Sequence, residues 1–219
     1  MKKLMFFLPL LASLFLFASK VAAQSDKLIE LPPHSTFGEM SLEHVLNRRR
    51  SVRQFKDMAL SKSDLSQLLW SAQGISNVER GLRTAPSAGA IYPLTTYAVT
   101  PDGVYRYLPE SHALKQVALG DQRMDMARAA FNQIWIRRAG LVIVFVADDT
   151  RMQRRYGENA ERFIDLEAGH AAQNVLLTAV SRDLAAVPVG AFDDEVLSDV
   201  LGLEEDVRPI YMVVVGKTP

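Results

Sequence analysis

Leu141-Val142-Ile143-Val144-Phe145-Val146-Ala147 is an uninterrupted apolar run dominated by β-branched side chains. Because polar residues do not alternate with apolar ones, the run predicts a strand that is covered on both faces of a sheet. Residues 210–215 form a second run of this type and predict another buried strand. Two such strands imply a central sheet that needs covering layers on both sides.

Two further patterns predict a long helix and a pair of strands. Residues 159–182 carry the longest helical pattern of the chain and lie between the two buried strands. The small residues Ala168, Gly169, Ala171 and Ala172 would let another helix approach closely, within the core or across a subunit interface. Residues 95–100 and 104–108 predict two strands joined by Pro101-Asp102-Gly103, in which proline sets φ and glycine permits the reversal.

Shorter helices complete the expected fold. Ser41 can cap a helix that runs to about Arg48, and Ser61 with Asp64 has capping-box spacing before a helix that stops near Gly74. A further helix is expected from about Asp194. The order of elements predicts an α+β sandwich, with a central, mostly antiparallel sheet flanked by helices.

The composition excludes several classes of protein. The 219 residues carry 25 basic and 25 acidic side chains and no cysteine. Without cysteine there are no disulfides, thiol nucleophiles or cysteine-ligated metals. A balanced charge argues against a nucleic-acid partner, which requires a clear positive excess.

The first residues differ from the rest of the chain. Met1-Lys2-Lys3, the apolar run 4–18 and Val21-Ala22-Ala23 predict a secretory signal peptide over residues 1–23. A membrane anchor would need about 20 apolar residues, and Pro9 interrupts this shorter run. We therefore expect Sec-dependent export to the periplasm or the medium, followed by a loose arm over residues 24–40 and one folded domain over residues 41–219.

Arg48-Arg49-Arg50-Ser51-Val52-Arg53-Gln54-Phe55 is the first segment with chemical information. Basic residues near a helix C-terminus often only complement the helix dipole, and a charge run is usually a solvated face. Four arginines within six residues, with a hydroxyl among them, exceed that need. Planar guanidinium groups match phosphate oxygens. The segment is a candidate anion site, with a plain surface patch as the alternative.

Two further segments are rich in small residues. Arg83-Thr84-Ala85-Pro86-Ser87-Ala88-Gly89-Ala90-Ile91-Tyr92-Pro93 is either an ordinary surface loop or a loop whose backbone amides approach a flat ligand, with Ile91 or Tyr92 on its edge. Ala186-Val187-Pro188-Val189-Gly190-Ala191-Phe192-Asp193 follows the long helix. Its Gly190 either makes a simple turn or exposes an N–H to a ligand.

Together and in this order, the segments resemble the nitroreductase family of FMN-dependent oxidoreductases, most closely its SagB-type branch, which includes azoline dehydrogenases. The similarity spans about residues 42–216. It is carried by Arg49-Arg50-Ser51-Val52-Arg53, by residues 86–93, by Leu166-Glu167-Ala168-Gly169-His170-Ala171-Ala172-Gln173-Asn174 and by Val189-Gly190-Ala191-Phe192. The resemblance implies a homodimer with two FMN sites at the interface, each built from both subunits.

The resemblance also implies roles for single residues. Arg49 and Ser51 match positions that hold the FMN phosphate, and Arg53 matches a basic position beneath the pyrimidine end of the flavin, where positive charge raises the reduction potential. The Gly190 N–H would donate to flavin N5. The implied cofactor-binding residues are Arg49, Arg50, Ser51, Arg53, Pro86, Ser87, Ala88, Gly89, Ile91, Val189, Gly190, Ala191 and Lys217.

Other candidates are less specific. Azoline dehydrogenases carry a Lys-Tyr pair before the long helix, where this chain has Arg155-Tyr156. Arginine stays protonated and cannot act as a base, so Tyr156 remains as a candidate donor. His170 is a candidate catalytic residue, although a structural, hydrogen-bonded histidine is favoured. No metal is expected, because His34, His44, His112 and His170 lack ligand spacing.

Met124, Met126 and Trp135 are expected on a helix that faces the substrate or the dimer partner. The resemblance implies an enzyme that positions FMN and transfers hydride through flavin N5 to or from a small molecule or a peptide. An exported enzyme has no obvious NAD(P)H pool, so the electron donor or acceptor, the substrate and the direction stay open. The alternatives are a flavin-binding carrier or sensor without turnover, and a degenerate domain that dimerises and binds nothing.

Overall fold

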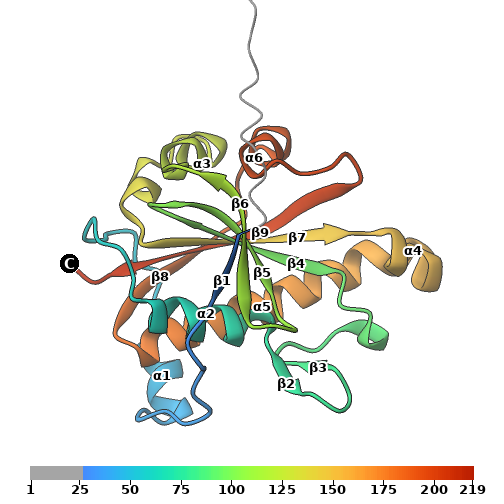
Figure 1. Cartoon of the computed structure of the whole chain (residues 1–219), viewed down its shortest axis with the longest axis horizontal. Helices are drawn as coiled ribbons and strands as arrows, with labels where there is room; N and C mark the ends of the chain where they lie inside the picture. The colour runs from blue at the N-terminus through green and yellow to red at the C-terminus, as the bar shows by residue number, and fades with distance from the viewer. Residues whose placement is uncertain (1–26) are drawn as a thin grey trace, which may run out of the picture.

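The computed structural model describes residues 27–219, and the predicted signal peptide lies outside the described residues (Figure 1). Within that range, the main sheet has seven strands in the order β1-β6-β5-β4-β7-β9-β8. Each pair of neighbouring strands in this sheet is antiparallel. The predicted sandwich with a mostly antiparallel sheet is therefore confirmed.

The bounds of the elements are as follows. The strands of the main sheet are β1 (Leu28–Glu30), β4 (Leu94–Thr100), β5 (Gly103–Leu108), β6 (Ala113–Leu119), β7 (Leu141–Asp148), β8 (Leu184–Val189) and β9 (Val207–Lys217). A separate hairpin holds β2 (Ile75–Asn77) and β3 (Leu82–Arg83). The α-helices are α1 (Leu42–Arg48), α2 (Lys62–Gln73), α3 (Arg123–Ala129), α4 (Thr150–Tyr156), α5 (Ala160–Ser181) and α6 (Asp194–Leu201). Short 3-10 helices are η1 (Ala88–Ala90), η2 (Ile134–Arg138) and η3 (Gly157–Asn159).

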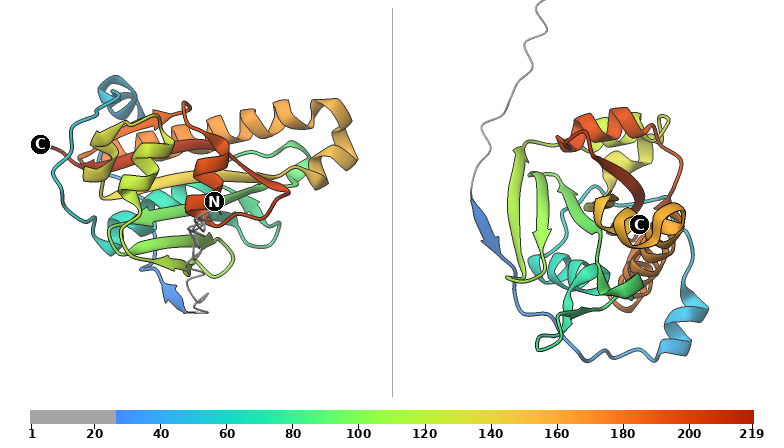
Figure 2. Two further views of the ribbon diagram at one scale, coloured as in Figure 1. Left: turned by 90° about the horizontal axis from the view of Figure 1, so that it is seen from above. Right: turned by 90° about the vertical axis from the view of Figure 1, so that its right-hand side faces the viewer.

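Strand β7 lies between β4 and β9, as its sequence predicts. Its side chains alternate between two hydrophobic clusters. Ile143 and Phe145 pack in the cluster that includes residues of α2 and α5, whereas Val142 and Val144 pack in the cluster that includes residues of α3 and α6. Figures 1 and 2 show these two layers of helices on opposite faces of the sheet.

Local sequence signals account for several boundaries. The Ser61 hydroxyl accepts a hydrogen bond from the Asp64 N–H, and the Asp64 carboxylate accepts one from the Ser61 N–H, so the predicted capping box starts α2. Ser41 caps α1 in a similar way through the N–H of His44. The predicted hairpin is confirmed by the pairing of Thr100 with Gly103.

The alanines of α5 settle a question that the sequence leaves open. Ala168, Ala171 and Ala172 are buried within the chain, whereas Gly169 is exposed. Helix α2 packs closely against α5, which explains why small side chains are needed there. These alanines therefore belong to the core of one chain and give no support to a subunit interface.

Other expectations need correction. The arm is not wholly loose, because β1 pairs with β6 and adds an edge strand to the sheet. Met126 is buried in the core cluster on the α3 side of the sheet, and Trp135 packs against Phe55 with ring centroids 6.0 Å apart. Met126 therefore serves core packing, whereas Trp135 is only half-buried at the border of that cluster.

Two strands have no clear sequence signal. β6 lacks strict alternation, and β8 is rich in alanine and contains Pro188, which an edge strand tolerates because one side of its backbone is free. None of the helices within residues 27–219 combines the length and the apolar character that crossing a bilayer requires.

Candidate functional site

The arginine-rich segment lies along the outer edge of β8. The N–H of Val52 donates to the carbonyl of Ala186 at 3.0 Å, and Ser51 forms a parallel bridge with the same residue. Gly190 directly follows β8 and is exposed. Two of the three predicted cofactor segments, far apart in the sequence, therefore meet at one edge of the sheet.

The cations of this segment differ in their partners. Arg48 pairs with Asp183 at 3.4 Å, and Arg50 donates to the carbonyls of Asn47 and Arg49 at 2.9 and 2.7 Å. Within residues 27–219, the ion pairs of the chain do not include Arg49, Arg50 or Arg53. Three positive charges without a carboxylate partner, next to the exposed Ser51, suit an anion with several oxygen atoms.

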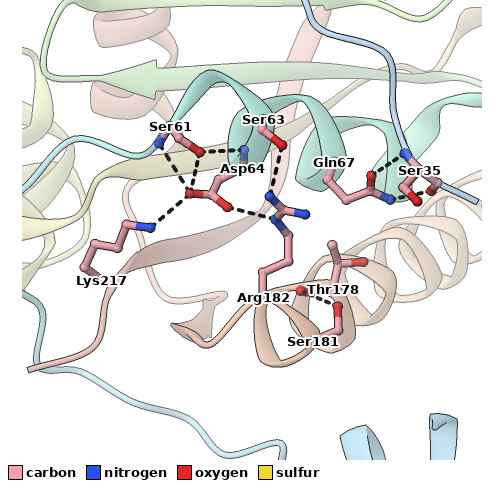
Figure 3. Close-up of polar contacts among 9 residues, drawn as sticks. All are labelled: Ser35, Ser61, Ser63, Asp64, Gln67, Thr178, Ser181, Arg182 and Lys217. Atoms are coloured by element: carbon pink, nitrogen blue, oxygen red, sulfur yellow. Dashed lines mark hydrogen bonds and ion pairs between the residues drawn. The ribbon is translucent and has the colours of Figure 1, made fainter. Parts of the chain in front are cut away.

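Lys217 is placed differently. Its Nζ lies 3.0 Å from Oδ2 of Asp64, while Nε of Arg182 lies 2.8 Å from Oδ1 of the same carboxylate (Figure 3). Burial alone would raise the pKa of Asp64, but hydrogen bonds from Ser61, Lys217 and Arg182 bring that pKa below its ordinary value. Lys217 thus belongs to an ion-pair cluster between α2, α5 and β9 and is engaged by a carboxylate, unlike Arg49, Arg50 and Arg53.

Hydrogen bonds join the loop over residues 84–92 to the C-terminal end of α2 and to α5. The Thr84 N–H and hydroxyl donate to the carbonyls of Gly74 and Trp70 at 3.0 Å each. The Asn174 side-chain amide of α5 donates to the carbonyl of Thr84 at 3.2 Å. The Ser87 hydroxyl accepts a hydrogen bond from the Tyr92 N–H at 2.9 Å. The loop therefore has a defined shape before any ligand arrives.

Glu167 lies beneath this loop and is only 2% exposed. The Gln73 amide donates to Glu167 Oε1 at 3.3 Å, and Nη1 of Arg83 donates to Oε1 of Gln73 at 3.3 Å. Burial raises the pKa of Glu167, and the Ser87 hydroxyl, the Gln73 amide and the Arg83 charge oppose that rise. Glu167 and Asn174 both lie in the quoted motif of α5, but no sequence pattern assigns a role to either side chain.

The tip of the loop has an unusual backbone. Gly89, Ala90 and Tyr92 all have positive φ values, of 61°, 53° and 53°. A Cβ atom added at Gly89 would lie 2.7 Å from the Tyr156 hydroxyl and 2.8 Å from Cζ of Arg155. Glycine is required here both by the backbone and by the close approach of α4. The Arg155-Tyr156 pair therefore lies directly against the loop.

The remaining predicted site residues differ in how far they are buried. Pro86 is exposed and Ser87 and Ala88 are half-buried, whereas Ile91 points into the core cluster on the α5 side. Val189 is likewise buried, on the other face of the sheet, while Ala191 is exposed. The loop contributes backbone and small side chains to a surface, and Ile91 and Val189 support it from within.

His170 lies exposed on α5, and no hydrogen bond joins it to another residue in the range 27–219. The favoured expectation of a hydrogen-bonded structural histidine is therefore wrong for the single chain. His112, in contrast, bonds to Tyr107 and Ser66 at 2.8 Å each, and His34 stacks on Trp70. Within the part of the chain that the structure describes, no three histidine or carboxylate side chains group as a metal site would require.

The residues of both regions fit the parts of FMN. The unpaired arginines and Ser51 suit a phosphate. Gly190 leaves its edge of the sheet open, since a Cβ atom there would meet only the ring of Tyr211, at 3.4 Å. The arginine segment borders a cavity of 250 Å³ with Leu176 and Val180 near the end of α5. The loop contacts α5 earlier, at Glu167 and Asn174, so the two regions occupy different stretches of that helix.

Comparison with known proteins points in the same direction. The sequence profile described as "Nitroreductase family" matches residues 46–217. The nitroreductase-family protein MJ1384 of Methanocaldococcus jannaschii is 39% identical over 185 residues, which cover 82% of this chain and 92% of that protein. The FMN reductase (NADPH) of Bacillus subtilis strain 168 is 24% identical, with 80% and 65% covered. A solved nitroreductase-family structure from Ralstonia eutropha JMP134 is 34% identical and superimposes with a TM-score of 0.81. The matched region covers 91% of this chain and 92% of the Ralstonia chain.

Proposed function

Because the chain belongs to the nitroreductase family, we propose that it is an exported, FMN-dependent oxidoreductase of the SagB-type branch. The proposal rests on one observation above all: Arg49, Arg50 and Arg53 have no carboxylate partner within residues 27–219, while the neighbouring cations Arg48 and Lys217 do. Bound FMN supplies an atom, N5, that accepts and returns a hydride. The protein holds and tunes that group and contributes no obligatory acid or base.

The arginine segment supplies the charge for binding. Arg49, Arg50 and Ser51 hold the phosphate through charge-assisted hydrogen bonds. Arg53 places positive charge near the pyrimidine end of the flavin, which favours the anionic reduced form and raises its potential. Both assignments follow the family resemblance and are supported by the lack of carboxylate partners for Arg49, Arg50 and Arg53 within residues 27–219.

The small-residue segments supply shape. Pro86 to Gly89 lines the flat ring with backbone atoms, and the positive φ of Gly89 is part of that surface. Gly190 offers its N–H at the end of β8, at the position that the resemblance assigns to flavin N5. Tyr156 lies against Gly89 and is the side chain best placed to donate a hydrogen bond to a substrate there.

A homodimer completes the proposal. Helix α1 exposes Leu42 and Leu46 to 60% and 49%, one helical turn apart, and α5 exposes Leu166 to 50%. A second copy that covers these side chains would remove apolar surface from water. The family resemblance implies that each FMN site of such a dimer is built from both subunits.

Export restricts the electron donors and the substrates that the proposed enzyme can meet. The predicted signal peptide over residues 1–23 directs the chain to a compartment without an obvious NAD(P)H supply. We infer that the enzyme exchanges electrons with an acceptor or donor other than a free nicotinamide. The substrate is a small molecule or a peptide of the cell envelope.

A visible spectrum of residues 24–219, recorded before and after incubation with FMN and desalting, tests the cofactor. The proposal expects one FMN per subunit. A chain that stays colourless is a degenerate domain, which overturns the proposal. An anaerobic titration with NADH and NADPH then tests the donor. Strong NADPH turnover without an added substrate would overturn the exported, nicotinamide-independent role, and bound flavin that no reductant reduces would indicate a carrier.

A further inference from the structure

Glu167 is a buried carboxyl group that the proposed chemistry does not use. It is 2% exposed on α5, and the Gln73 amide donates to its Oε1 at 3.3 Å. Its second oxygen, Oε2, is buried and has no hydrogen-bond partner within residues 27–219. A buried ionised carboxylate would leave that oxygen poorly compensated, whereas a protonated carboxyl group costs much less to bury.

The groups around Glu167 come from three elements. Gln73 faces it from α2, and Ser87 faces it from the loop. Arg83 of β3 is the charged group that acts on it, and this guanidinium group is shared with Gln73 and with Glu110, at 3.3 Å each. One cation divided among several acceptors compensates a buried negative charge only in part.

Ser87 connects this carboxyl group to the shape of the loop. Its hydroxyl accepts the Tyr92 N–H at 2.9 Å, and a hydrogen bond from the Ser87 side chain is one of the effects that oppose the raised pKa of Glu167. A change in the charge of Glu167 therefore acts first on the residue that closes residues 87–92 into their strained turn. Gly89, at the tip, has no room to shift toward α4, because Tyr156 and Arg155 lie there.

We propose that protonated Glu167 is a positioning residue for the cofactor loop, acting through Ser87, and that it makes FMN affinity depend on pH. This inference rests on the proposed function. When the carboxyl group ionises, Oε2 must gain a hydrogen-bond donor, which requires water or a moved loop. A cofactor that covers the loop excludes that water and holds the loop in place, so it favours the protonated form.

The direction of the effect follows from linkage. If the complex keeps the proton more strongly than the free protein, binding takes up a proton, and affinity falls as the pH rises above the value at which free Glu167 ionises. The decline amounts to about tenfold per pH unit until the bound form also ionises. Burial already raises the pKa of Glu167 in the free chain, which moves this range toward neutral pH.

The experiment compares residues 24–219 with the variants Glu167→Gln and Glu161→Gln. Glutamine keeps the shape and hydrogen-bonding capacity of Glu167 but cannot ionise. Glu161 lies on the same helix and is exposed, so its substitution is the matched control. FMN dissociation constants are measured by flavin fluorescence between about pH 4.5 and pH 9, and ionisation of the FMN phosphate contributes equally to all three profiles.

In the parent and in Glu161→Gln we expect affinity to fall by about tenfold per pH unit wherever free Glu167 is ionised and bound Glu167 is protonated, and we expect Glu167→Gln to lack this fall. Parallel profiles in all three proteins would overturn the inference. Urea unfolding of the chains without FMN gives a second readout: because the pKa of folded Glu167 is raised, Glu167→Gln should gain stability relative to the parent as the pH rises from about 4.5 upward.

Two further outcomes are decisive. If the parent binds no FMN at any pH, both the proposed function and the inference fail. If all three proteins bind FMN with parallel pH profiles, only the inference fails. If Glu167→Gln does not fold, Ser87→Ala takes its place, because it removes the hydroxyl that joins the carboxyl group to the loop. Ser87→Ala should flatten the pH profile, and a profile like that of the parent would overturn the inference.

Discussion

The ammonium group of Lys217 donates a hydrogen bond to the carboxylate of Asp64 at 3.0 Å, so the last strand is tied to the first turn of α2. The same carboxylate accepts a hydrogen bond from Arg182, at the end of α5. Three elements that are far apart in the sequence thus meet at one buried acid. Lys217 is thus engaged by a carboxylate, whereas Arg49, Arg50 and Arg53 have no carboxylate partner within residues 27–219.

Replacing Lys217 and replacing the arginines should therefore have different effects. Lys217→Met is expected to lower the free energy of unfolding by about 1 kcal/mol and to change FMN affinity by less than about threefold. The double change Arg49→Gln and Arg53→Gln should weaken FMN binding by about tenfold or more, because charge-assisted hydrogen bonds are lost, with little effect on stability. Urea unfolding and flavin fluorescence measure the two quantities. Equal losses of FMN affinity would show that Lys217 leaves Asp64 to bind the phosphate.

Asp64 should matter more for stability than either of its cations. Asp64→Ala removes half of the capping box and leaves Arg182 and Lys217 without their shared partner, so we expect a loss of about 3 kcal/mol. Ser61→Ala, which removes only the reciprocal cap, should cost about 1 kcal/mol. Chemical unfolding at neutral pH checks both values. A loss in Asp64→Ala no larger than that in Ser61→Ala would mean that the ion pairs contribute nothing.

Asp64 also gives the chain a defined acid sensitivity. Its pKa is lowered in the folded state, so its contribution to stability is fully present above the ordinary pKa of an aspartate and is lost as the pH falls through the lowered value. The stability of Asp64→Ala should therefore depend less on pH in this acidic range than that of the parent. Parallel unfolding profiles would contradict this account.

Gly89 and Gly81 allow backbone strain to be separated from steric conflict. Both have φ near 61°, but a Cβ atom at Gly81 would have nothing within 4 Å, whereas one at Gly89 would lie 2.7 Å from the Tyr156 hydroxyl. Gly81→Ala should cost about 1 kcal/mol for the left-handed backbone alone. Gly89→Ala should cost clearly more, and adding Tyr156→Ala should recover part of the difference. Equal losses at the two glycines, measured by thermal unfolding, would show that α4 moves away freely.

His112 should make the attachment of the N-terminal arm sensitive to acid. The His112 ring forms hydrogen bonds with the Tyr107 hydroxyl and with the carbonyl of Pro32. Burial lowers the pKa of His112 and also that of His34, whose ring lies edge-on to the His112 ring with the centroids 5.4 Å apart. A lowered histidine pKa stabilises the fold above the ordinary value of about 6.5, and this stability is lost as the pH falls.

The parent should therefore be less stable at pH 5 than at pH 8, and His112→Gln should show a smaller difference. Tryptophan fluorescence during urea unfolding follows this change, since Trp70 stacks on His34. His44→Gln, at an exposed position on α1, is the matched control and should behave like the parent. An unchanged pH dependence in His112→Gln would exclude His112 as its source.

Much of the fold could be predicted because its signals are local. The apolar run at residues 141–147 specified a strand buried on both faces, and Ser61 with Asp64 specified the start of a helix. β6 and β8 were missed because their residues lack period and β-propensity, and their pairing comes from neighbours far away in the chain. The burial of Met126 was missed because a sequence does not say which side of a helix faces the core.

The candidate site divides in the same way. The sequence by itself determined which functional groups the site can use: a run of arginines, two segments of small residues and a long helix with an acidic residue in its middle. Only the tertiary structure decided which cations are free, since Asp183 and Asp64 neutralise Arg48 and Lys217 but do not reach Arg49 or Arg53. It also decided that Glu167 lies buried beneath the loop. These ion pairs and the contact of Gln73 with Glu167 join residues between 94 and 153 positions apart in the chain, and no local pattern records them.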